Sequence, residues 1–179
     1  MAAVVLLKGV NVGGHRRFRP TALAQELRDL DVVNVGAAGT FVVRAAVSHG
    51  ELREAVARRL PFEAEIMICR GTDVARLMSR DFFEDYPVKA DTVRFVSVLS
   101  RAPRSARMLP LDLPSHEDWL VKVVARRGRF LVGMHRRQMK AIGELGRLEQ
   151  VFGGTATTRS WSTMSAVRKI LCGSLSGTR

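Results

Sequence analysis

The stretch "AAVVLLKGV", residues 2–10, decides the fold. It is short, rich in aliphatic and β-branched side chains and broken by a glycine, which is typical of a β-strand. Its apolar character is nearly continuous, because Lys8 is the one charged residue in it. A strand that is apolar on both sides needs cover on both sides. We therefore expect this strand to lie in the interior of a sheet.

The segments that follow complete a recognisable order of elements. Residues 20–30 and 49–60 carry leucine and valine at helical spacing, and each has a proline at one end. Residues 32–36, 40–47 and 65–70 are typical of strands. The resulting order, β-α-β-β-α-β, is that of the ferredoxin-like plait. Right-handed crossovers would place both helices on one face of an antiparallel sheet.

The second half of the chain repeats this order less regularly. A helical link, a strand, a proline-rich irregular segment, a hairpin and two helices are predicted at 72–83, 91–100, 101–114, 118–135, 136–152 and 160–173. Arg127 and Gly128 lie at the hairpin tip, and Ser162 is the expected N-cap of the last helix. We predict an α+β protein of two packed ferredoxin-like halves with antiparallel sheets. The halves are 1–71 and a degenerate 72–179, which carries the basic hairpin and the C-terminal helix.

The charge of the chain is strongly positive and unevenly spread along the sequence. The net charge of the 179 residues is +12. Residues 119–179 hold 12 Lys and Arg against 2 Asp and Glu, whereas residues 1–118 hold 17 against 15. Such an excess favours anionic partners and says nothing about the fold. The basic character is therefore predicted to belong to the C-terminal third.

Several classes of protein do not fit this composition. The four histidines and two cysteines lack the spacing of metal ligands, and no G-x-S-x-G nucleophile motif occurs. Cys69 and Cys172 are far apart and are expected to be small buried hydrophobes in a reducing cytoplasm. No apolar run is long enough to span a membrane. We predict no metal, no cofactor, no catalytic residue and no membrane association.

The loop after the first strand, "GVNVGGH", is the first candidate for a ligand site. Amides freed by Gly13 and Gly14, together with Asn11 and His15, could bind a small anion ahead of a helix. The loop matches neither G-x-G-x-x-G nor a P-loop. A tight turn, in which Asn11 hydrogen-bonds to its own backbone and the glycines adopt positive φ, explains the same residues.

Two long motifs resemble one bacterial family. "LLKGVNVGG" (6–14) and "ATTRSWST" (156–163) are similar to the opening and closing motifs of the family filed as domain of unknown function 1697. A third motif of that family, Q-S-G-N-V-V-F, departs here to "AAGTFVV" and has Ala38 and Thr40 where the family has Ser and Asn. The resemblance implies two ferredoxin-like halves. It implies no activity, and no catalytic residue is carried over from it.

The closing motif is the second candidate for a ligand site. A phosphate or carboxylate could lie between Thr158, Arg159 and the amides that start the last helix. The alternative is a capped helix whose Trp161 anchors the tail on the core.

The basic hairpin is the third candidate. It predicts a surface that follows a nucleic-acid backbone, made of Arg126, Arg127, Arg129, Arg136, Arg137 and Lys140. Base stacking of the RNA-recognition type is not expected, because Arg129, Leu131 and Met134 stand where that motif needs aromatics. A solvated face of an arginine-rich protein explains the same residues.

Three functions remain open at this point. The first is non-enzymatic binding of a polyanion such as nucleic acid through the basic surface. The second is binding of a small anionic ligand, or an enzyme, that uses the loop from Asn11 to Gly14 with Thr158 and Arg159. The third is an interaction module that forms a homodimer through an uncovered sheet face.

Overall fold

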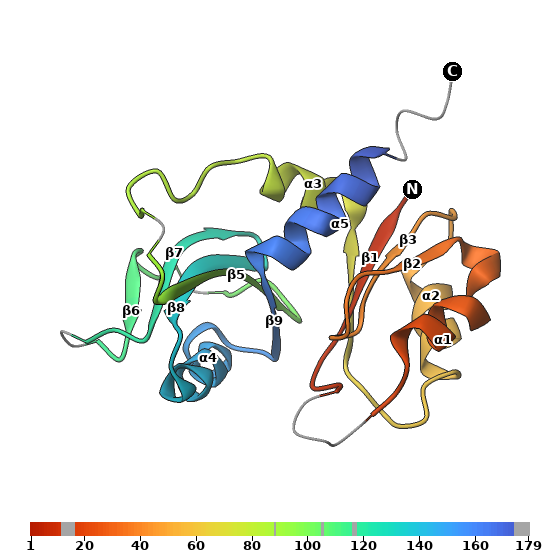
Figure 1. The fold of residues 1–179 in the computed structure, drawn as a ribbon, viewed down its shortest axis with the longest axis horizontal. Coiled ribbons are helices and arrows are strands. Elements are labelled where there is room, and N and C mark those ends of the chain that lie inside the picture. The colour runs from red at the N-terminus through yellow and green to blue at the C-terminus, as the bar shows by residue number, and fades with distance from the viewer. Residues whose placement is uncertain (12–16, 88, 105, 116–117, 174–179) are drawn as a thin grey trace. The chain divides into compact units, whose positions relative to one another are not determined.

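The computed structural model describes residues 1–11, 17–87, 89–104, 106–115 and 118–173 (Figure 1). The chain divides into two compact units, Met1–Ser79 together with Thr163–Arg179, and Arg80–Ser162. The predicted division at residue 71 stays a prediction. The units differ from it mainly by placing the C-terminal helix with the first half.

The first unit is built on a four-stranded antiparallel sheet. Its elements are β1 (Ala3–Leu7), α1 (Pro20–Glu26), the 3₁₀ turn η1 (Arg28–Leu30), β2 (Val32–Asn34), β3 (Thr40–Val43), α2 (His49–Ala57), β4 (Ile66–Arg70) and α3 (Gly71–Met78). The strand order is β2-β3-β1-β4. The strand β1 therefore lies in the interior of the sheet, as its composition predicts, and pairs with β3 and β4.

The core of the first unit follows from the alternation of side chains along β1. Val5 and Leu7 point to one face, where they form one cluster with Leu23 of α1 and Leu52 of α2. Both helices therefore cover the same face (Figure 1). On the opposite face Val4 is also fully buried. The continuous apolar run is thus explained by a strand that is buried on both sides.

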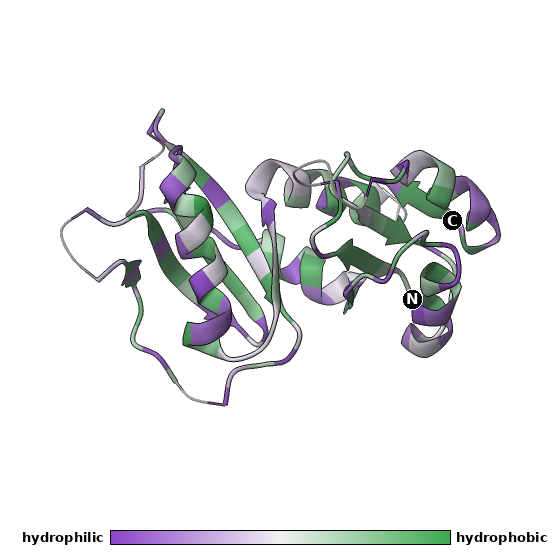
Figure 2. Cartoon of the chain, turned by 90° about the horizontal axis from the view of Figure 1, so that it is seen from below, coloured by the Kyte–Doolittle hydropathy of each residue, from purple (hydrophilic) through white to green (hydrophobic). Residues whose placement is uncertain are grey.

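The second unit is built on a five-stranded antiparallel sheet. Its elements are β5 (Thr92–Leu99), β6 (Leu111–Leu113), β7 (Val121–Arg127), β8 (Phe130–Arg136), α4 (Met139–Phe152) and β9 (Ala156–Ser160). The strand order is β6-β7-β8-β5-β9. Phe95, Leu131 and Val123 pack with Leu148 and Phe152 of α4 in one cluster. Figure 2 shows the hydrophobic residues concentrated on the strands and the hydrophilic ones on helix surfaces and loops.

Four local expectations were wrong. The proline-rich segment contains the short edge strand β6, and the closing motif contains the strand β9, which pairs with β5. The last helix, α5 (Trp161–Gly173), begins at Trp161, one residue before the predicted cap. Cys172 is exposed, whereas Cys69 is buried as expected.

The mixed α and β content and the antiparallel sheets are confirmed. The finer assignment of both halves to the ferredoxin-like plait stays a prediction. In the described part of the chain, no helix combines the length and apolar character needed to cross a membrane.

Candidate anion-binding surface

The structure separates the six predicted cations of the basic hairpin into two groups. Arg126, Arg127 and Arg129 lie at the tip between β7 and β8. Arg136 lies at the other end of β8, where it pairs with Thr92. Seven residues of strand separate Arg129 from Arg136, which is about 23 Å at about 3.3 Å per residue. The six cations therefore do not form a single patch.

The tip group gains three arginines from the loop at residues 100–110. This loop leaves β5 beside the tip, because Leu99 N donates to Arg129 O at 2.9 Å. It enters β6 beside β7, where Leu111 pairs with Val123. Since β8 and β7 lie between β5 and β6, the loop passes the tip of the hairpin. We call the following residues the arginine cluster: Arg101, Arg104, Arg107, Arg126, Arg127 and Arg129.

The members of the arginine cluster have two different roles. Arg126 Nη1 lies 3.4 Å from Pro103 O, and Arg129 Nη1 lies 3.5 Å from Ser100 O. These two arginines are half-buried and hold the loop against the hairpin. The other members, Arg101, Arg104, Arg107 and Arg127, are exposed. Within the described residues, none of these four forms an ion pair with a carboxylate.

The sequence around the arginine cluster contains no neutralising residue. Residues 100–110 and 119–143 hold no Asp or Glu. Sequence reasoning missed the three loop arginines because it looked for charge along the hairpin. The repeated spacing R-x-x-R-x-x-R in "RAPRSAR" was the signal that could have found them.

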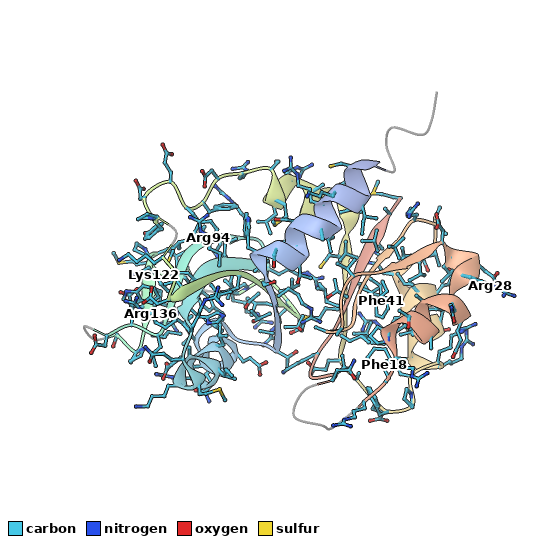
Figure 3. All side chains as sticks on the ribbon, in the orientation of Figure 1. Phe18, Arg28, Phe41, Arg94, Lys122 and Arg136 are labelled. Atoms are coloured by element: carbon cyan, nitrogen blue, oxygen red, sulfur yellow. The ribbon has the colours of Figure 1, made fainter. Side chains whose placement is uncertain are left out.

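The cations at the other end of β8 are satisfied locally. Arg136 pairs with Asp91, and its guanidinium carbon lies 4.2 Å from the centre of the Trp119 ring. Lys122 pairs with Asp112 and lies 5.2 Å from the centre of the same ring. Figure 3 shows Arg94, Lys122 and Arg136 together at this end of the sheet. The half-buried ring of Trp119 thus contacts two cations that each have a carboxylate partner, and this arrangement has a structural explanation. Of the predicted residues here, Arg137 and Lys140 are exposed.

The net charge is shared evenly between the two units. Residues 80–162 hold 15 Lys and Arg against 9 Asp and Glu, and the remaining residues hold 14 against 8. The excess of the C-terminal third is reduced because acids from residues 80–118 fold beside it, as Asp91 and Asp112 do. A concentrated positive surface is therefore a property of the arginine cluster and not of the whole second half.

The second candidate site, in the closing motif, is divided by strand alternation. Thr158 and Arg159 are neighbours on β9, so their side chains point to opposite faces of the sheet. The Thr158 hydroxyl lies 2.5 Å from the hydroxyl of Ser97, which is fully buried. Arg159 Nη1 instead donates to Thr157 Oγ1 at 2.9 Å and to Thr158 O at 2.8 Å. The partner hydroxyl of Arg159 is thus Thr157, which sequence reasoning missed.

The side chain of Arg159 is a buried cation. It is 8% exposed, and removal from water lowers the pKa of its guanidinium to about 10. Guanidinium groups are buried most often where they bind an anion or complete a hydrogen-bond network. An anion site at Thr158 and Arg159 stays a prediction. The side-chain hydroxyl that Arg159 contacts belongs to Thr157 and not to Thr158.

In the first candidate site, the opening loop, Asn11 is the predicted residue that the structure describes. This residue has a φ of 55°, in the left-handed region. Its Oδ1 accepts from Phe18 N at 3.0 Å, and its Nδ2 donates to Ala37 O at 2.8 Å. These bonds join Asn11 to Phe18 and to the segment before β3. The turn and the anion site both stay predictions. Gly13, Gly14 and His15 lie outside the described residues, so an anion site there stays a prediction.

Metal binding has no support in the described residues. No three His, Cys, Asp or Glu side chains gather there in a way that could hold an ion.

With the geometry in hand, comparison with known proteins identifies the family. A family profile described as "Protein of unknown function (DUF1697)" matches residues 1–127. The chain belongs to this family. The match to DUF1697 includes the opening motif, the whole first sheet and the hairpin as far as Arg127. The closing motif at 156–163 lies beyond it.

A solved structure shows the same fold over the full length. The conserved bacterial protein SP0830 from Streptococcus pneumoniae matches with a TM-score of 0.59 and 16% sequence identity. The match covers 95% of this DUF1697 chain and 98% of that chain. At this identity the likeness concerns the fold alone. A search of curated proteins finds no match.

Proposed function

We propose that this protein binds a polyanion, with nucleic acid as the expected class, through the arginine cluster. One observation carries the proposal. Four exposed arginines on two segments lie at one end of the second sheet, and the described carboxylates pair with none of them. Guanidinium groups form paired hydrogen bonds with phosphate oxygens, which suits them to phosphate-rich partners.

The architecture supports this surface as a built feature. Arg126 and Arg129 donate hydrogen bonds to the loop backbone at Pro103 and Ser100, so the start of the loop is held at the hairpin tip. Ser100 N donates to Thr155 O at 2.8 Å and fixes the start of the loop. We include in the proposal that the first unit is a ferredoxin-like plait, which its element order and strand order support. A cytoplasmic location is proposed on the two free cysteines.

Retention on immobilised heparin tests the proposal, because heparin is a dense polyanion of no particular sequence. The test variant carries Arg101→Glu, Arg104→Glu and Arg127→Glu. The control carries Arg28→Glu, Arg58→Glu and Arg168→Glu, three exposed arginines of the first unit. Both variants change the net charge equally.

The test variant should elute at a clearly lower NaCl concentration than the control, because retention would depend on the arginine cluster and not on net charge. Equal elution of the two variants would mean that the protein is retained by its overall charge alone, and the proposal would fail. Circular dichroism of both variants checks that each is folded.

The small-ligand alternative rests on the buried guanidinium of Arg159. Isothermal titration with phosphate and short carboxylates tests it. Binding to the unmodified protein that is lost in Arg159→Met would favour the alternative. The same binding heat in the unmodified protein and in the variant would exclude it. A homodimer stays a further proposal, although β1 offers it no exposed apolar face because Val4 and Leu6 are fully buried.

A further inference from the structure

We propose that the polyanion which the arginine cluster recognises is a nucleic-acid duplex, bound across its two phosphate rows without reading the bases. This inference rests on the proposed function and adds the class of partner. It depends on the width of the cluster, on the side chains that it lacks, and on the division of its arginines between two segments.

The arginine cluster extends across several strands of the second sheet. The loop at residues 100–110 runs from β5 to β6, and β8 and β7 lie between them. Three spacings between neighbouring strands make this width about 14 Å. A duplex presents one phosphate charge per about 1.7 Å of its axis, whereas one strand presents one per about 3.4 Å. Across 14 Å a duplex therefore offers about eight charges in two rows, and a single strand offers about four in one row.

The exposed arginines lie on two segments, as two phosphate rows require. Arg127 is on the hairpin tip, and Arg101, Arg104 and Arg107 are on the loop. The hairpin tip can therefore contact one phosphate row while the loop contacts the other.

The aromatic platform of a single-strand binder is missing from the described residues of the cluster. Proteins that bind single strands stack the bases on exposed aromatic rings. Phe130 is the one aromatic residue within 100–110 and 124–131, and it is 8% exposed. Trp119 is at the other end of the hairpin strands, where Arg136 and Lys122 cover its ring.

A lipid surface fits the cluster less well than a duplex. Peripheral membrane segments bury a broad apolar face in the interface in addition to their cations. Met108 is 92% exposed, and it is the one large apolar side chain that is exposed in the described part of the loop and the hairpin tip. The cluster therefore offers guanidinium groups for phosphate and little apolar surface for a membrane.

Fluorescence anisotropy tests the inference with a labelled DNA duplex and with one of its strands, between about 50 and 200 mM NaCl. We expect the duplex to bind at least about tenfold more tightly than the strand at each salt concentration. We expect little difference between duplexes of unrelated sequence, because phosphate contacts carry no base information. Four contacts predict a slope of log K against log salt of about −3.6.

Single-residue variants test which arginines contact the phosphates. Arg101→Gln, Arg104→Gln and Arg127→Gln should each reduce the magnitude of that slope by about 0.9, because each removes one phosphate contact. The matched control is Arg58→Gln, an exposed arginine of the first unit, which should leave the slope unchanged.

The outcomes separate this inference from the proposed function. A strand bound as tightly as the duplex would overturn the duplex preference and leave polyanion binding intact. Binding to vesicles of phosphatidylserine and phosphatidylcholine that depends on the cluster, without duplex binding, would show that the partner is a lipid surface. Heparin retention that does not depend on the cluster would remove the proposed function itself.

Discussion

Arg159 shows what burial does to a single charge. Water favours the protonated guanidinium, so its removal from water lowers the pKa to about 10, well below the ordinary value for arginine. A lowering of this size costs the folded state about 3 kcal/mol at pH 7. Thr157 and the backbone of Thr158 offset part of the cost by hydrogen bonding. A charge retained at such a cost is the reason to keep the small-anion alternative open.

The pH dependence of stability tests this account of Arg159. Below pH 10 the guanidinium is charged in both states and its cost is fully present. Above pH 10, and up to the ordinary pKa of arginine, the unfolded chain binds more protons than the folded chain, so the stability rises with pH. Relative to Arg159→Met, the unmodified protein should gain about 1.4 kcal/mol between pH 8 and pH 11. Urea unfolding at both pH values measures the difference, and a constant difference would contradict the lowered pKa.

Alanine substitutions at two glycines of the second unit should change the stability in opposite directions. A Cβ on Gly133 of β8 would lie 2.3 Å from Lys122 O and 2.8 Å from Phe95 Cζ. Gly133→Ala should therefore destabilise the protein by about 2 kcal/mol, because backbone must move. A Cβ on Gly143 of α4 would meet nothing within 4 Å. Gly143→Ala should stabilise by about 1 kcal/mol through helix propensity.

Chemical denaturation of the two alanine variants compares these effects directly. Equal changes in both variants would show that the contacts around Gly133 do not limit the packing of β8.

At the scale of elements, β9 depends on a pair of polar side chains. Its sequence, "ATTRS", has no large apolar residue, so the strand is held by its pairing with β5. The hydroxyls of Ser97 and Thr158 lie 2.5 Å apart on the face that also carries Phe95 and Leu99. A buried hydrogen bond of this kind fixes the register of an edge strand.

A double-mutant cycle tests the role of this pair. Thr158→Val should cost about 1–3 kcal/mol, because it leaves the buried Ser97 hydroxyl without that partner. The combination of Ser97→Ala with Thr158→Val should cost less than the sum of the two single changes. Additive costs would show that the two hydroxyls do not interact. Thermal melts of the four proteins supply the data.

The hydrophobic pattern located the elements that have an apolar face. Residues 2–10, 20–30 and 49–60 have that pattern, and each forms the predicted element at nearly the predicted place. β6 and β9 were missed because one is proline-rich and the other is polar. Their strand character comes from their pairing with other strands, β7 and β5, and the local hydrophobic pattern does not report such pairing.

At the scale of the whole molecule, the net charge of +12 acts against compactness. Like charges in the arginine cluster repel one another, and added salt screens the repulsion. The melting temperature should therefore rise when NaCl is raised from about 20 to 200 mM, over which the screening length falls from roughly 20 to 7 Å.

The neutral variant with Arg101→Gln, Arg104→Gln and Arg127→Gln should melt at a higher temperature than the unmodified protein at low salt. The two should converge at high salt, because screening removes the repulsion in both. A salt-independent difference, measured by scanning calorimetry, would mean that these arginines affect stability through packing rather than charge.

The sequence by itself determined the type and order of the elements that have an apolar face, the interior position of β1 and the family to which the chain belongs. These follow from apolar periodicity and from a motif, which are local along the chain. Only the tertiary structure decided which charges gather. It separated Arg136 from Arg129 by the length of a strand, brought the loop that carries Arg101 and Arg104 to the hairpin tip, placed Asp91 on Arg136, and put Thr158 and Arg159 on opposite faces. The physical reason is that electrostatic interactions depend on distance in space, and pairing between distant segments sets that distance.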